Sequence, residues 1–155
     1  MNKTTSTAPY ILVVIDMQPG FRASLNEATI DCVAGEIRAA RAENLPIVIL
    51  EYAKYPATHE RLLQLVEGYE NVAIETKRED DGSDELLEAC IGNEYFQNVY
   101  RVCGVNTLQC VQSTVLGVAD RLEDSRIEVV KSACNDEEGP NVWHKFAQRP
   151  NVCFA

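Results

Sequence analysis

Short apolar runs alternate along the chain with longer segments in which apolar residues recur at helical spacing. The first run, at 10–16, is apolar up to its last residue, as is typical of a strand covered on both faces. Comparable runs predict five further strands, at 46–52, 71–76, 98–104, 126–131 and 151–155. The segments between them predict helices at 24–44, 58–66, 83–91, 107–123 and 141–149.

Polar residues predict where four of these helices begin. Ser24, with Glu27 three positions later, forms a capping box. Thr58, Ser83 and Thr107 are expected to be the N-caps of the next three helices. Each of these hydroxyl groups should therefore accept a hydrogen bond from a backbone N–H of the first helical turn.

The alternation of strands and helices predicts parallel βαβ units with right-handed crossovers. We expect one α/β domain over residues 1–155, a Rossmann-like three-layer α/β/α sandwich around a mainly parallel six-stranded sheet. In such sheets, ligands bind beyond the carboxyl ends of the strands, at the point where the strand order reverses. Residues that directly follow strands are therefore the first candidates for chemistry.

Charge and composition exclude several classes of function. A net charge of -10 over 155 residues offers nothing to neutralise phosphates, so we expect no nucleic-acid partner. The apolar run near the start is too short for a signal peptide or a membrane span, which predicts a cytoplasmic protein with no membrane partner. The six cysteines show no CxxC or Cys/His metal spacing, so most should be buried thiols.

Three residues at predicted strand ends stand out, and the first is Cys110. With Thr107 as the N-cap, the thiol occupies the third helical position, where the helix N-terminus lowers a cysteine pKa. The free N–H groups there also suit an oxyanion. Cys110 is thus either a nucleophile or one more buried core thiol.

The other two strand-end residues are Asp16 and Lys77. Asp16 ends an apolar run, so its carboxylate either takes part in proton transfer or makes a structural hydrogen bond near the sheet end. Lys77 is followed closely by acidic residues. It is either an electrostatic partner for a thiolate or a solvated lysine that pairs with its neighbours.

Three segments resemble the isochorismatase-like cysteine hydrolases. The opening "ILVVIDMQPGF" (11–21) is similar to that family's first strand and loop, and "GVNTLQCVQST" (104–114) is similar to its nucleophile segment. The stretch "VAIETK" (72–77) stands where the family has its lysine strand. The resemblance extends from about residue 10 to residue 131.

The resemblance implies a catalytic triad of Asp16, Lys77 and Cys110. Cys110 would attack an amide-like carbonyl, Asp16 would act as base and then acid, and Lys77 would stabilise the thiolate and orient Asp16. Backbone N–H groups of Asn106 and Cys110 would form the oxyanion hole, beside a cis peptide bond at Val105–Asn106. The implied sheet order 3-2-1-4-5-6 requires the lysine side chain to reach across the second strand.

The resemblance also bears on substrate and metal. Gln18, Phe21 and Tyr52 are expected to contact the substrate. In this family, nicotinamidases carry a metal site formed by an Asp and histidines in the segment after the second strand. Here that segment, "EYAKYPATHERLL" (51–63), offers only His59 and no Asp-x-His arrangement. We therefore expect no metal and no other cofactor, and nicotinamide is disfavoured as a substrate. Leu108 stands where many relatives have an acidic residue.

The sequence thus predicts a metal-independent cysteine amidohydrolase that cleaves a C–N bond of a small amide or ureido compound through a thioester. A homodimer or homotetramer is expected from the resemblance. Three alternatives stay open: a non-catalytic small-molecule-binding protein of the same fold, a nicotinamidase-type amidase, and a thiol redox sensor at Cys110.

Overall fold

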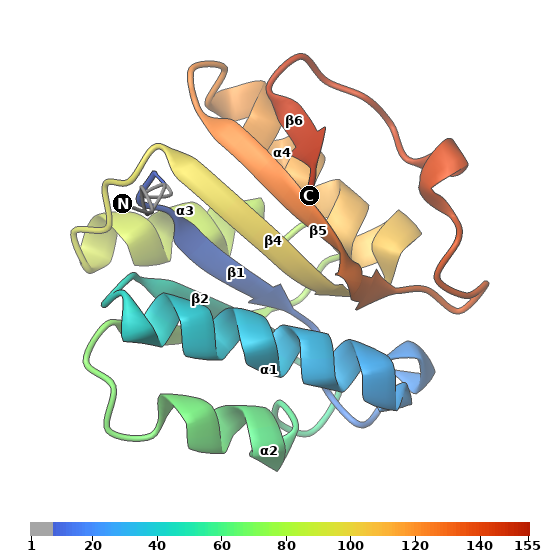
Figure 1. Cartoon of the computed structure of the whole chain (residues 1–155). Coiled ribbons are helices and arrows are strands. Elements are labelled where there is room, and N and C mark those ends of the chain that lie inside the picture. Colours follow the sequence, from blue (N-terminus) through green and yellow to red (C-terminus); the bar gives the residue numbers. More distant parts are fainter. Residues whose placement is uncertain (1–7) are drawn as a thin grey trace, which may run out of the picture.

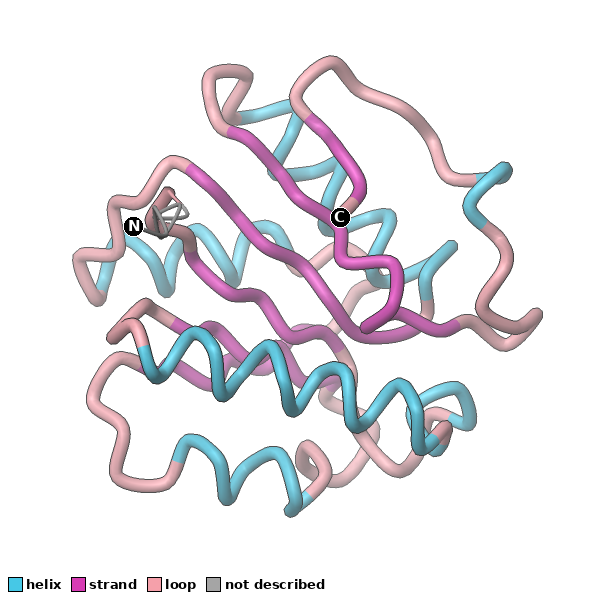
Figure 2. The backbone as a smooth tube through the Cα atoms, viewed as in Figure 1, coloured by secondary structure: helices cyan, strands magenta, loops and turns pink. Residues whose placement is uncertain are grey.

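A six-stranded sheet runs through the middle of the computed structural model, which describes residues 8–155 (Figures 1 and 2). Its strand order is β3-β2-β1-β4-β5-β6, and every neighbouring pair is parallel. The predicted fold and strand order are therefore confirmed. The strands are β1 (Ile11–Ile15), β2 (Ile47–Tyr52), β3 (Val72–Lys77), β4 (Val99–Val105), β5 (Arg126–Asn135) and β6 (Val152–Phe154).

Helices cover both faces of the sheet, as Figure 1 shows. The front layer holds α1 (Glu27–Ala42) and α2 (Glu60–Leu63); the rear layer holds α3 (Ser83–Gly92) and α4 (Gln112–Arg121). Alternate residues of each strand point to opposite faces, so the sheet separates two apolar cores. Strands buried on both faces explain the nearly continuous apolar runs of the sequence.

Short non-α turns complete the chain. Three are 3₁₀ turns, η1 (Arg22–Leu25), η2 (Gln64–Val66) and η4 (Trp143–Lys145), and η3 (Thr107–Val111) is a π-helical turn that leads into α4. The predicted helix at 141–149 is therefore wrong, since only η4 forms there. Trp143 and Phe146 instead pack with Phe154, at ring-centroid distances of 5.4–5.7 Å. Ala147 lies outside any helix, and its N–H donates to the side chain of Gln112 at the start of α4.

The predicted cap at Ser24 is wrong. The helix α1 begins at Glu27, and its N-cap is Asn26, whose side chain accepts from the N–H of Thr29 at 3.0 Å. Ser24 lies in η1, fully buried, and donates to the carbonyl of Phe21 at 2.8 Å. The tertiary contacts of the buried Ser24 thus outweigh its local preference for a capping position.

The predicted caps at Thr58, Ser83 and Thr107 are also wrong. Thr58 donates its hydroxyl to Glu51 at 2.7 Å, and His59 takes the N-cap position of α2. Ser83 and Thr107 are the first residues inside their helical segments rather than the residues before them. Both of these hydroxyl groups are buried, and neither has a hydrogen-bond partner within residues 8–155.

Gly104 allows β1 and β4 to approach closely near their carboxyl ends. It pairs with Ile15 in the sheet register and has a φ of +126°, in a region that side chains rarely adopt. A Cβ atom at this position would lie 2.1 Å from the carbonyl oxygen of Ile15. Glycine is therefore required where the sheet leads into the turn that carries Cys110.

Candidate active site

The three predicted strand-end residues lie at the carboxyl ends of their strands. Asp16 directly follows β1, Lys77 is the last residue of β3, and Cys110 lies in the π turn that follows β4. Asp16 has a φ of +53°, which is uncommon for a residue with a side chain and often marks a functional position. All three side chains are buried, with Asp16 and Lys77 at 0% exposure and Cys110 at 3%.

Lys77 reaches across β2 to Asp16. Its Nζ lies 3.0 Å from Asp16 Oδ2 and also donates to the carbonyl oxygen of Glu79 at 3.0 Å. The ammonium lies over the ring of Tyr52, 5.2 Å from the ring centroid, in a cation–π contact. The interpretation of Lys77 as a solvated lysine is therefore wrong, because the group is held entirely by protein atoms.

The carboxylate of Asp16 keeps unused hydrogen-bonding capacity. Apart from the ion pair with Lys77 and the neighbouring Cys110 thiol, neither oxygen has a hydrogen-bond partner in the described part of the chain. Burial raises the pKa of Asp16 above its ordinary value, and the nearby Lys77 ammonium offsets this only partly. Such a carboxyl group is suited to accept and return a proton.

The pKa of Cys110 is shifted in the opposite direction from the one predicted. Burial first, and the Asp16 carboxylate second, raise it to about 12, although Lys77 acts to lower it. The predicted helical position is also wrong, because the residue before the helical segment is Asn106 and Cys110 is the fourth residue of the π turn. The thiol is therefore protonated at rest and requires a base before it can attack.

The turn around Cys110 has two unusual backbone features. The peptide bond Val105–Asn106 is cis, at the predicted position. The N–H of Val111 donates to the carbonyl of Asn106 at 3.1 Å, which is a π-helical bond of the kind often found at functional sites. The side-chain oxygen of Asn106 is buried and has no partner within the residues described. The turn thus brings both predicted oxyanion-hole residues, Asn106 and Cys110, into one short segment.

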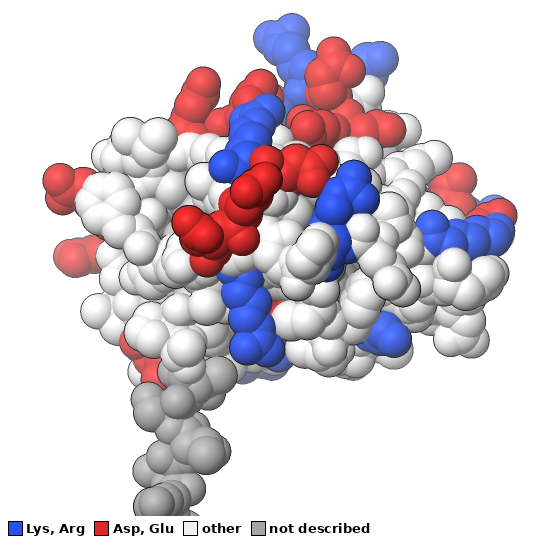
Figure 3. Space-filling view, turned by 90° about the horizontal axis from the view of Figure 1, so that it is seen from above, with Lys and Arg blue, Asp and Glu red and all other residues white. Residues whose placement is uncertain are grey.

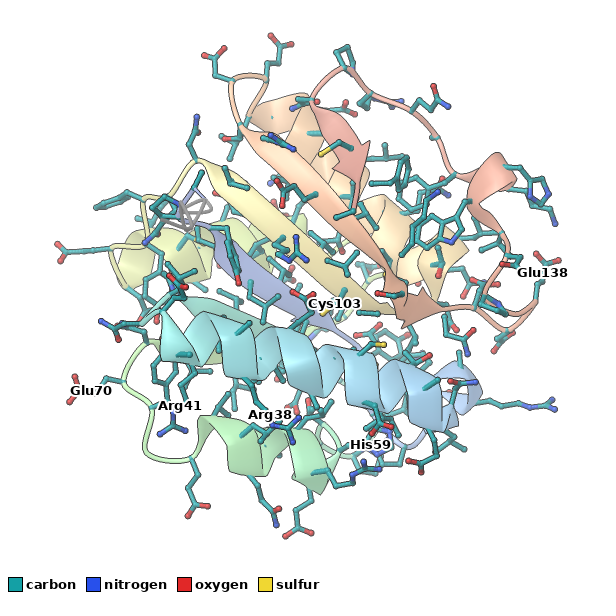
Figure 4. The ribbon with its side chains drawn as sticks, viewed as in Figure 1. Arg38, Arg41, His59, Glu70, Cys103 and Glu138 are labelled. Carbon is teal, nitrogen blue, oxygen red and sulfur yellow. The ribbon has the colours of Figure 1, made fainter. Side chains whose placement is uncertain are left out.

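An acidic side chain supports this turn from another strand. Asp136, directly after β5, accepts from the N–H of Leu108 at 3.0 Å and from the N–H of Glu138 at 3.1 Å. A cavity of about 390 Å³ lies on this side of the turn and is lined by Asn106, Leu108, Gln109, Asp136, Glu137 and Glu138. Figure 4 shows Glu138 on the loop beyond the end of β5. Asp136 therefore holds the backbone of the thiol turn to the loop that follows β5.

Gln18 clamps the loop after β1 to the loop after β2. Its side-chain Nε2 donates to the carbonyls of Tyr52 at 3.0 Å and Pro56 at 2.9 Å, and its Oε1 accepts from the N–H of Tyr52 at 2.7 Å. Gln18 is completely buried. Both ends of its amide are engaged by the backbone, so in this arrangement Gln18 positions the loop.

Three aromatic rings gather over this clamp. Phe21, Tyr52 and Tyr55 lie with ring centroids 4.7–5.9 Å apart, and Tyr55 is 42% exposed. Since Tyr52 also touches the Lys77 ammonium, the rings extend from the buried ion pair to the surface. Two of the predicted substrate contacts, Phe21 and Tyr52, therefore lie next to each other beside the triad.

The donor set near the site does not fit a metal ion. His59, which Figure 4 shows in front of the sheet near the start of α2, lies 3.0 Å from the Ser24 hydroxyl through its Nε2. Between residues 8 and 155, no group of three His, Cys, Asp or Glu side chains is arranged to hold a metal.

Sequence reasoning missed two acidic residues near the thiol turn, Asp80 and Asp136. The sulfur of Cys110 donates to Asp80 Oδ1 at 3.8 Å. In the sequence, Asp80 lies in a run of charged residues that is typical of a solvated loop, and no local signal marks it as a neighbour of Cys110. Asp136 follows the predicted fifth strand by five residues, because β5 continues to Asn135.

The surface carries charged side chains of both signs. Acidic and basic side chains are interspersed on the face shown in Figure 3. None of the helices within residues 8–155 is both long and apolar enough to span a membrane.

Comparisons with known proteins agree with the fold. A family model described as "Isochorismatase domain" matches residues 10–149, which is most of the chain. An isochorismatase from Pseudomonas putida superposes with a TM-score of 0.73 at 18% identity, covering 97% of this chain and 91% of that one. An N-carbamoylsarcosine amidase from Thermoplasma acidophilum superposes with a TM-score of 0.72 at 17% identity, covering 94% of this chain and 95% of that one. A nicotinamidase from Staphylococcus aureus superposes with a TM-score of 0.68 at 19% identity, covering 83% of each chain. The comparison with curated proteins found no match.

Proposed function

The chain belongs to the isochorismatase family, and on this premise we propose that it is a cysteine hydrolase that cleaves a C–N bond of a small amide or ureido compound. One observation carries the proposal. A fully buried ion pair between Lys77 and Asp16 lies beside the buried thiol of Cys110, and apart from the Lys77 ammonium and that thiol the carboxylate has no hydrogen-bond partner in residues 8–155. An ion pair left so incompletely satisfied contributes little to stability and is better suited to proton transfer.

The proposed first half-reaction forms a thioester. Asp16 takes the thiol proton as the Cys110 sulfur attacks the substrate carbonyl, and the carbonyl electron pair moves onto oxygen. Backbone N–H groups of Asn106 and Cys110 stabilise that oxyanion. When the intermediate collapses, the C–N bond breaks and protonated Asp16 gives its proton to the departing amine or ammonia.

The proposed second half-reaction restores the thiol. Water attacks the thioester carbonyl while Asp16 takes a proton from it, and the C–S bond breaks on collapse. The sulfur then recovers the proton from Asp16. Because burial raises the pKa of Cys110 to about 12, no thiolate is stored before attack, and the base is needed in each turnover. Lys77 orients Asp16 through both half-reactions and stabilises the transient thiolate.

The same pKa argues against the redox-sensor alternative. Sensor thiols are typically accessible and have a lowered pKa, whereas Cys110 is 3% exposed and its pKa is raised. A nicotinamidase-type reaction is disfavoured as well. The relatives' names include nicotinamidases, but the donor set around His59 does not fit a metal.

Several further features belong to this proposal. Phe21 and Tyr52 line the substrate path, because their rings lie between the surface and the Lys77 ammonium. The enzyme requires no metal or other cofactor, acts in the cytoplasm, and assembles as a homodimer or homotetramer. The net charge of -10 suits a small-molecule substrate rather than nucleic acid.

The test is ammonia release from a panel of nicotinamide, pyrazinamide, N-carbamoyl amino acids, simple carboxamides and ureas. We expect turnover of at least one compound other than nicotinamide, and an acyl-enzyme at Cys110 that mass spectrometry detects. Cys110→Ser should show neither turnover nor an acyl-enzyme. Ligand binding without turnover, unchanged in Cys110→Ser, would support the non-catalytic alternative. Turnover that persists in Cys110→Ser would reject the thioester route.

A further inference from the structure

A second carboxylate contacts the thiol from the solvent side. Asp80 lies in the turn between β3 and α3, and its side chain is exposed. Its Oδ1 nevertheless accepts from the Cys110 sulfur at 3.8 Å. The fully buried Asp16 also neighbours this sulfur, so the thiol has a second, exposed carboxylate in addition to the proposed base.

The turn that carries Asp80 is fixed by its backbone. The carbonyl of Asp80 accepts from Lys77 Nζ and from the Thr114 hydroxyl, each at 3.5 Å. The N–H of Gly82 donates to the same Thr114 oxygen at 2.9 Å, and a Cβ at Gly82 would lie 2.8 Å from Lys77 Cδ. The backbone from which the Asp80 carboxylate projects is therefore held by contacts that do not involve the carboxylate itself.

The charge of Asp80 is not cancelled by the site. Lys77 carries the one ammonium at the triad and is paired with Asp16 at 3.0 Å. Residues 78–81 add one basic and three acidic side chains, Arg78, Glu79, Asp80 and Asp81. Asp80 also raises the pKa of both Asp16 and Cys110, as a negative charge close to each would. A substrate that reaches the sulfur therefore meets a net negative field.

We propose that Asp80 is a specificity-determining residue that admits neutral or cationic substrates with N–H donors to the Cys110 sulfur and repels substrates that carry a carboxylate there. This inference rests on the proposed function and narrows its substrate class. An amide, ureido or ammonium group donates hydrogen bonds to the Asp80 carboxylate, whereas a substrate carboxylate is repelled by it.

Alkylation of the thiol tests this without requiring turnover. The rate at Cys110 is measured for neutral iodoacetamide and for anionic iodoacetate, and the two are expressed as a ratio. Since both reagents attack the same thiolate, the ratio cancels any change in the thiol pKa. We expect Asp80→Asn to lower the iodoacetamide-to-iodoacetate ratio roughly tenfold, because a like charge near contact distance is removed.

Matched variants provide the controls. Glu79→Gln removes one negative charge from the same turn without touching the sulfur, and its ratio should stay within about twofold of the wild type, because exposed charges are screened. Asp80→Ala should change the ratio in the same direction as Asp80→Asn, which keeps the test available if one variant folds poorly. Cys103, fully buried in the sheet, serves as an internal reporter of unfolding through its own alkylation.

The outcomes separate the two hypotheses. A ratio that is unchanged in both Asp80 variants, or that falls equally in Glu79→Gln, rejects the inference even if an amide is hydrolysed. A lowered ratio without turnover of any amide supports charge selection by Asp80 and counts against the proposed hydrolase.

Discussion

Two groups of charged side chains are built into this sheet, and they differ in how completely each is satisfied. On the face covered by α1, Arg101 of β4 binds Glu36 through two hydrogen bonds of 2.7 and 3.0 Å and binds Glu128 of β5 at 3.2 Å. The side chain of Arg101 is 22% exposed. At the carboxyl edge, Lys77 and Asp16 form a single contact of 3.0 Å at 0% exposure.

The two groups differ in how much hydrogen-bonding capacity remains after their contacts within the protein. The hydrogen bond with Glu36 raises the pKa of Arg101 and keeps it charged, and its fork-like geometry matches that of the carboxylate. The carboxylate of Asp16 has no such set of donors in the part of the chain described, and burial raises its pKa. A satisfied pair holds elements together, whereas an incompletely satisfied one retains capacity for chemistry.

The largest expected effect is on turnover. Asp16→Asn should lower kcat/KM by roughly a thousandfold, because the variant cannot accept the thiol proton. Glu36→Gln should change kcat/KM less than about twofold, since a salt bridge remote from the sulfur has no part in the reaction. Ammonia release from the best panel substrate measures both. Equal losses of kcat/KM in the two variants would contradict the view that only the Lys77–Asp16 pair takes part in the reaction.

The next effect is on stability. Lys77→Met should lower the free energy of unfolding by about 3–5 kcal/mol, because it leaves the buried Asp16 charge without a partner. Arg101→Met should cost less, about 2 kcal/mol, since its carboxylates retain access to water. Urea unfolding followed by circular dichroism measures these values.

A double variant sharpens the stability comparison. Asp16→Asn/Lys77→Met removes both buried charges and should recover about half or more of the stability lost in Lys77→Met. A double variant no more stable than Lys77→Met would contradict the view that the uncompensated charge causes the loss.

The smallest expected effect is a change in the shape of a pH profile. Asp16 must be ionised to act as base, and burial raises its pKa, so alkylation of Cys110 by iodoacetamide should increase as pH rises through that raised value. A pH-independent range should follow. A second increase should come as the thiol itself ionises near its pKa of about 12.

Asp16→Asn should remove the pH-independent range and leave one increase. That increase should occur at lower pH than the second increase of the wild type, because the Asp16 charge that raises the thiol pKa is gone. Rates are measured by tandem mass spectrometry, which distinguishes Cys110 from Cys103 on the same peptide. A wild-type profile that levels off near pH 9 would show an ordinary thiol and contradict the assigned environment.

The sheet could be predicted from the sequence because burial on both faces leaves continuous apolar runs. The starts of the helices could not be predicted, because the expected capping hydroxyl groups make tertiary contacts instead. The hydroxyl of Thr58 donates to the carboxylate of Glu51, and that of Ser24 contacts a backbone carbonyl and His59. The predicted helix at 141–149 does not form, because Trp143 and Phe146 pack with the distant Phe154, which local spacing does not reveal.

The candidate site was predictable where chemistry coincided with strand ends. Asp16, Lys77 and Cys110 follow or end strands, so the topology alone brings them to one edge. The pKa of Cys110 could not be predicted, because the spacing that suggests a helix start does not reveal burial or the carboxylates around the sulfur. Asp80 was hidden for a related reason, since only the folded turn carries it to the thiol.

The close approach at Gly104 has a consequence for how this protein tolerates mutation. The residue has no functional group, yet a side chain of any size would meet the backbone of Ile15 and force β1 away from β4. Asp16 follows one of these strands and Cys110 the other, so substitution at Gly104 would alter the distance between base and nucleophile. In a scan of all single substitutions, position 104 should tolerate as little change as the triad itself.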